Sequence, residues 1–173
     1  GRYWLYLFLP KGNIDLVYTF LTMFRFFLAG VSLSVMAIYF RRSYLATWVA
    51  SKAYAFSGFA LFAGTRHFTF IVSLITLPLL VTGMERLIRF KKWYLFTVMV
   101  AISLLCSYYF LYMNTIVLGF YYISRILCTK EYRNLKTFIG RGLIIVGSYT
   151  LGCSMGVLSI ATHFGSYLSS GRS

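Results

Sequence analysis

One long apolar run, residues 93–127, limits how this chain folds more than any other feature of the sequence. Its 35 residues include no acidic side chain and a single basic one, Arg125, close to the end. As one straight helix the run would be about 52 Å long, whereas the hydrocarbon core of a membrane is about 30 Å thick. We therefore expect a hairpin that enters and leaves through the same membrane face, with arms at 93–112 and 115–127 and its tip at Asn114.

The composition places the chain in a membrane. Of its 173 residues, 60% are hydrophobic and 20% are aromatic. A soluble domain of this length cannot bury that much apolar surface. We expect an all-α, polytopic helical membrane protein in which residues 1–173 form a single integral membrane domain.

Further apolar stretches complete a layout of about five to six membrane segments that includes two hairpins. The expected segments are 14–40, 44–64, 68–84, 93–112, 115–127 and 142–168. The apolar part of residues 1–12 is too short to span, so we expect a short interfacial N-terminal segment, with an extended arm on a partner subunit as the alternative. No internal repeat is evident, and the two hairpins are expected to resemble each other in shape but not in residues.

Basic residues far outnumber acidic ones, with 17 lysines and arginines against three carboxylates. They cluster at the ends of apolar segments, where they meet anionic lipid headgroups, so we expect lipid and not nucleic acid as the charged partner. With six crossings, twelve basic residues fall on one side and four on the side of the termini. The positive-inside rule then places the twelve in the cytosol or matrix.

Arg25 is the most conspicuous single residue, because an arginine inside a membrane segment is costly unless it pairs or snorkels to the interface. It suits a salt bridge to a partner helix or a clamp on a lipid phosphate. The basic clusters that flank the long apolar run have the same interpretation, with plain solvated charge as the alternative. The candidate residues for binding a partner or a lipid phosphate are Arg25, Arg86, Arg89, Lys91, Lys92, Lys130, Arg133 and Lys136.

The last span, 142–168, is rich in glycine and serine. Ser148, Gly152 and Gly156 are spaced by four residues and therefore share one helix face. Small residues at this spacing let another helix approach closely. We predict a helix-packing face that contacts a helix of this chain or of a partner, although membrane helices also use glycine more often than soluble ones do.

The sequence offers few groups for catalysis. Asp15, Glu85 and Glu131 each lie near a segment end beside basic residues, so we interpret them as capping or interface residues. Glu85 and Arg89 are expected to form an ordinary helix pair worth a few tenths of a kcal/mol. Because no carboxylate lies in the middle of a span, we expect that the protein is not an enzyme.

Two histidines, His67 and His163, fall at the same membrane face in this layout, where a pair of imidazoles can ligate a haem iron. The motif GTRH at 64–67 resembles the cytochrome b anchor subunits of succinate dehydrogenase, but the second histidine of that motif is absent. Two separate interfacial histidines are the commoner arrangement. We expect no metal and no cofactor, apart from bound phospholipid such as cardiolipin.

Residues 120–138, FYYISRILCTKEYRNLKTF, join an aromatic pair to a basic, polar stretch. This segment resembles the end of the last membrane hairpin in the transmembrane protein 33 family of the endoplasmic reticulum and nuclear envelope. The glycine-rich last span departs from that family's pattern. The resemblance implies membrane shaping by hairpins as an alternative function.

Together these features predict a non-catalytic integral subunit of a larger membrane protein complex, which contributes helix packing, assembly and anionic-lipid binding. The mitochondrial inner membrane is the favoured location, because basic, aromatic-rich and acid-poor chains are common among its subunits. The expected partners are anionic lipids and other integral membrane subunits. The alternatives are a hairpin scaffold of the endoplasmic reticulum or nuclear envelope and a small transporter or lipid-handling protein.

Overall fold

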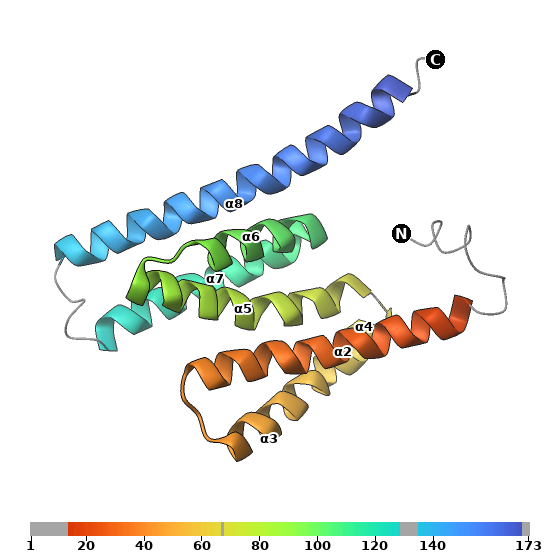
Figure 1. Ribbon diagram of the computed structural model, residues 1–173, viewed down its shortest axis with the longest axis horizontal. Helices are drawn as coiled ribbons and strands as arrows, with labels where there is room; N and C mark the ends of the chain where they lie inside the picture. Colours follow the sequence, from red (N-terminus) through yellow and green to blue (C-terminus); the bar gives the residue numbers. More distant parts are fainter. Residues whose placement is uncertain (1–13, 67, 129–134, 171–173) are drawn as a thin grey trace.

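The computed structural model describes residues 14–66, 68–128 and 135–170, and its regular elements there are all α-helices (Figure 1). They are α2 (Ile14–Tyr39), α3 (Tyr44–Ala55), α4 (Gly58–Arg66), α5 (Phe68–Phe90), α6 (Tyr94–Cys106), α7 (Tyr108–Cys128) and α8 (Leu135–Ser170). Among these described helices α2, α5, α7 and α8 are long and apolar enough to cross a membrane, and α6 is a shorter apolar helix. The predicted all-α, polytopic membrane fold is confirmed, whereas the predicted interfacial segment 1–12 lies outside the described residues.

Successive helices run back and forth across the molecule (Figure 1). Helices α2, α5 and α7 run in one direction, and α3 with α4, α6 and α8 run in the other. The connections that follow α2 and α5 therefore lie at one end, together with the last turn of α7. We call it the basic end, because it carries Arg41, Arg42, Lys91, Lys92 and Arg125. The start of α2 and the end of α8 lie at the opposite end, which is the layout that the charge distribution predicts.

The hairpin within residues 93–127 turns at Ser107 and not at Asn114, so its predicted tip was wrong. Helix α6 ends before Ser107, whose backbone is extended with φ −169° and ψ 115°. Helix α7 continues unbroken through Asn114, which is buried. Asparagine interrupts an apolar pattern by its polarity, yet inside a helix its backbone groups stay paired and its side chain turns toward the protein interior.

Three further boundaries differ from the predicted segments. The segment 44–64 is divided into α3 and α4, the segment 68–84 continues as α5 to Phe90, and the segment 142–168 begins earlier, because α8 starts at Leu135. The second difference matters for the site, because it puts Glu85 and Arg89 on the last turns of a membrane helix. Helix geometry favours this continuation, since residues four apart with opposite charge stabilise each other on a helix.

The two connections at the basic end are alike in sequence, which corrects the expectation that no repeat is present. Residues 40–47 read FRRSYLAT and residues 90–97 read FKKWYLFT. Arg41 and Lys91 both have a φ of 55°, the left-handed conformation that often ends a helix. Helices α3 and α6 then start at matching positions of the two copies. The α2–α3 and α5–α6 hairpins, which are not the two hairpins expected at 44–84 and 93–127, therefore share residues as well as shape at their turns.

Helix α5 is the central helix of the bundle. In its membrane window 56% of the residues are buried, against 17–22% for the other three candidate spans. It packs against α2, α6 and α7, while α8 packs mainly on α6. The main core consists of the buried side chains Leu80, Met84, Leu87, Ile88, Phe96, Val100, Leu111 and Leu118. This packing brings the carboxyl ends of α2, α5 and α7 to the basic end.

Candidate functional site

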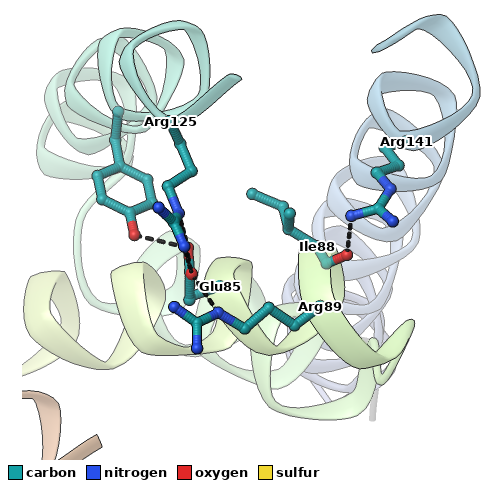
Figure 2. Close-up of polar contacts among 6 residues, drawn as sticks. Glu85, Ile88, Arg89, Arg125 and Arg141 are labelled. Carbon is teal, nitrogen blue, oxygen red and sulfur yellow. Dashed lines mark hydrogen bonds and ion pairs between the residues drawn. The ribbon is translucent and has the colours of Figure 1, made fainter. Parts of the chain in front are cut away.

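Glu85 lies in the last two turns of α5 and is fully buried. Side chains from two helices donate to its carboxylate (Figure 2). Arg89 of α5 donates from Nε to Oε1 at 2.6 Å. From α7, Nη2 of Arg125 lies 2.8 Å from Oε1, and the Tyr121 hydroxyl donates to Oε2 at 2.7 Å. We call these four residues the Glu85 cluster.

Helix spacing explains how the Glu85 cluster forms. Glu85 and Arg89 are four residues apart on α5, and Tyr121 and Arg125 are four apart on α7, so each pair occupies one helix face. Arg125 Nε also donates to both carboxylate oxygens, at 3.0 and 3.2 Å. A carboxylate offers about four acceptor positions, so these donors fill the acceptor positions of Glu85. The cluster therefore carries two positive charges against one negative charge and has no acceptor left for another cation.

The sequence-based interpretation of Glu85 was wrong about its surroundings. The expected pair with Arg89 is present, but the carboxylate is fully buried within the protein and is also bonded to α7. Breaking a buried ion pair costs about 3–5 kcal/mol, far more than an exposed helix pair is worth. The sequence signal that indicates this contact is Arg125, the single charge of the long apolar run, four residues after Tyr121.

A second arginine joins the carboxyl end of α5 to α8. Nη1 of Arg141 donates to the backbone carbonyl of Ile88 (Figure 2). Ile88 lies in the last turn of α5, where carbonyl groups have no partner within the helix. Arg141 therefore caps α5 from a neighbouring helix and closes the basic end on that side.

Beside the Glu85 cluster lies a shallow cleft of about 310 Å³, which we call the α5–α7 cleft. It is lined by Phe40, Arg89, Tyr121, Ser124, Arg125 and Cys128. Most of its lining surface is apolar, and the polar part comes from Arg89, Tyr121, Ser124 and Arg125. The arrangement suits an amphiphilic ligand whose negative charge and acceptors reach Arg89, because that side chain is 41% exposed.

The structure does not bring all predicted binding residues together. Arg86 and Lys92 line a different hollow, between α5 and α6, while Lys91 is exposed. Arg25 is half-buried on α2, with its charge in electrostatic range of Cys106 of α6. Some of the predicted binding residues lie outside the described residues, namely Lys130, Arg133, the Lys136 side chain and the imidazoles of His67 and His163.

The predicted small-residue face of α8 lies against α6. The backbone carbonyl of Ser148 accepts a bond of 3.3 Å from the Thr97 hydroxyl. A Cβ atom on Gly152 would come within 2.7 Å of the Thr97 carbonyl oxygen, and one on Gly156 within 2.7 Å of Leu104 Cδ2. These contacts leave room for hydrogen and nothing larger, which lets the two helix backbones approach closely.

Comparison with known proteins places the chain in a family. A family model described as "Bacterial membrane protein YfhO" matches residues 3–173. The chain belongs to the YfhO family. A relative from Bacillus subtilis (strain 168), named "Uncharacterized protein YfhO", is 34% identical over 80 residues. That match covers 46% of this chain and 9% of the relative, so the chain spans a small part of the relative's length. No solved structure matches.

YfhO membership bears on the predicted location. An integral membrane protein is what both the family description and the apolar helices support. The mitochondrial inner membrane has no support, because the family is described as bacterial, and the same description gives none to the endoplasmic reticulum or nuclear envelope. The family description identifies a bacterial membrane protein and states no activity.

Proposed function

We propose that this chain is a non-catalytic helical unit of a larger membrane protein assembly in a bacterial membrane. It packs against further membrane helices and binds anionic lipid at its basic end. The Bacillus relative supports this proposal, because the matched segment makes up 9% of that protein.

The observation that carries the proposal is a second stripe of small residues on α8, on the side away from α6. It consists of Gly140, Gly147, Ser154 and Ala161, which recur every seven residues and are all exposed. A Cβ atom on Gly140 or Gly147 would meet nothing within 4 Å. Heptad spacing holds such residues on one helix face. Small residues on a membrane helix favour close packing of another helix, which supports a partner on this outer face.

The charge of the basic end supports the lipid-binding part of the proposal. Its described cations are Arg41, Arg42, Arg86, Arg89, Lys91, Lys92, Arg125 and Arg141, and among the described residues there Glu85 alone is acidic. Each basic residue near a membrane surface contributes roughly 1 kcal/mol of attraction to anionic lipid. A basic end of this kind therefore binds the anionic leaflet of a bacterial membrane.

Blue-native electrophoresis of chain extracted in mild detergent tests the assembly. A Cβ atom at Gly147 meets nothing within 4 Å, so Gly147→Leu extends into open space on the outer stripe and should leave the helical fold intact. We expect the wild-type chain to migrate with additional protein mass and Gly147→Leu to migrate alone. Gly119→Leu, the same change at an open position of α7, is the control and should leave the assembly intact. A wild-type chain that migrates alone, or equal loss in both variants, contradicts the proposal.

A further inference from the structure

We propose that the α5–α7 cleft is a specific site for the phosphate of an anionic phospholipid headgroup. This inference rests on the proposed lipid binding and assigns that binding to one site. The charge of the basic end alone would distribute lipid binding over many basic residues. The site combines the guanidinium groups of Arg89 and Arg125 with the hydroxyl-bearing residues Tyr121 and Ser124.

The charge balance of the Glu85 cluster selects an anion. The carboxylate of Glu85 is fully buried and already receives donors from Arg89, Arg125 and Tyr121, so it cannot bind a cation from the cleft. The single negative charge of Glu85 is shared between two guanidinium groups, so it neutralises Arg89 only in part. The remaining positive charge of Arg89 faces the cleft, because Arg89 lines it.

Arg89 provides the donors for a phosphate. A guanidinium group has five N–H donors, and the contact between Arg89 and Glu85 uses Nε. Its side chain is 41% exposed, so its terminal nitrogens reach solvent or a ligand. Planar guanidinium groups bind phosphate through paired hydrogen bonds, for which a lysine is a weaker substitute. Glu85 thus orients Arg89 through Nε while the outer edge of its guanidinium faces the ligand.

The position of the cleft favours a lipid over a soluble phosphate. Arg89 is one residue before the end of α5, and Arg125 is three residues before the end of α7, so the cleft lies where membrane helices leave the hydrocarbon core. Phe40 adds an apolar wall beside the arginines, as the glycerol and first acyl carbons of a lipid require. A volume of about 310 Å³ is roughly ten times that of one water molecule in the liquid, enough for a phosphodiester group.

Native mass spectrometry of the full chain in detergent, titrated with phosphatidylglycerol or phosphatidylcholine, tests the site. We expect the wild-type chain to retain phosphatidylglycerol in preference to phosphatidylcholine. Arg89→Gln should weaken phosphatidylglycerol binding about tenfold, because a charge-assisted hydrogen bond is lost. Lys92→Gln removes the same charge at the same end but outside the cleft, and should change binding less than about twofold.

A second variant covers the case in which Arg89→Gln does not fold. Among the described contacts Ser124 donates to the Phe120 carbonyl of its own helix, so Ser124→Asp removes no existing bond of the Glu85 cluster. The new carboxylate competes with phosphate for the arginines, and we expect a similar tenfold loss. Equal losses in Ser124→Asp and Lys92→Gln would overturn the proposal, as would displacement of phosphatidylglycerol by inorganic phosphate, which would mark a site for free phosphate.

The same preparations separate this inference from the proposed assembly. Gly147→Leu should lose the partner mass and keep the lipid preference, because α8's outer stripe is not part of the cleft. Arg89→Gln should keep the partner mass and lose the lipid preference. If Arg89→Gln keeps the lipid preference while Gly147→Leu loses its partner, the site is wrong and the assembly stands.

Discussion

Glu85 and Arg125 are 40 residues apart in the sequence, and their side chains meet at 2.8 Å between α5 and α7. The carboxylate is fully buried, whereas the Arg125 side chain is 28% exposed. This contact fastens α7 to the central helix α5 at the basic end. Because a buried charge without its partner is costly, the contact should control how firmly α7 is held.

Glu85→Gln should lower the free energy of unfolding by about 3 kcal/mol, because two arginines then face each other without their counter-charge. Detergent-induced unfolding of the purified chain measures the change. The double variant Glu85→Leu with Arg125→Leu should recover most of the loss, since the charge that remains, on Arg89, belongs to a side chain that is 41% exposed and can be hydrated. Arg86→Gln on the same helix, outside the cluster, is the control. A loss in Arg86→Gln as large as that in Glu85→Gln would contradict a special role for the contact.

The α6–α8 contact predicts an order among three glycine substitutions. Gly152→Ala should be the most damaging, by about 1–3 kcal/mol, because its Cβ would meet the backbone oxygen of Thr97. Gly156→Ala should cost less, since the atom it meets is the mobile end of Leu104. Gly147→Ala meets nothing and should stabilise the helix by up to about 1 kcal/mol. Thermal unfolding in detergent gives the order, and a Gly152→Ala variant as stable as Gly147→Ala would contradict the packing.

Asn114 predicts a stabilising substitution. Its Nδ2 atom is buried and has no hydrogen-bond partner among the described residues. Asn114→Leu removes the unsatisfied donor and should raise the free energy of unfolding by about 1–3 kcal/mol. Asn114→Asp keeps the shape and adds a charge, and should lower it. A destabilised Asn114→Leu variant would show that this amide is hydrogen-bonded in the folded protein.

The repeated turn makes a prediction at its left-handed position. Lys91 has a φ of 55°, a conformation that costs an L-residue roughly 1–2 kcal/mol but costs glycine little. Lys91→Gly should therefore stabilise the chain by about 1 kcal/mol, as measured by thermal unfolding. The control Lys92→Gly removes the same charge without relieving the backbone, and it should give no gain. Equal effects at the two lysines would attribute the change to charge alone.

Much of the fold is predictable from the sequence, because apolar length and basic segment ends report directly on membrane insertion. The long apolar run predicts a hairpin, and the charge distribution predicts that both ends of this hairpin lie at the basic end. The position of the turn is not predictable in this way. Ser107 and Asn114 are both polar breaks in an apolar run, and packing of Asn114 into the interior decides between them.

The candidate site shows the same limit. Arg89 is recognisable from its spacing to Glu85, and Arg125 from its isolation in an apolar run. That they share one carboxylate depends on the α5–α7 contact, a tertiary relationship that no local pattern records. The basic clusters beyond that contact look equally promising in the sequence, yet Lys92 lines another hollow and does not join the Glu85 cluster.

The central claim, a helical unit that docks through the outer face of α8, is tested most directly by photo-cross-linking in intact membranes. A photoreactive benzoylphenylalanine is placed in turn at Gly147, at Ser154 and, as control, at Gly119 of α7, all exposed positions. Irradiation should produce a defined higher-mass protein adduct from the two α8 positions and none from the α7 position. Adducts with lipid alone at all three positions would contradict the account, because the outer face of α8 would then lie against the bilayer.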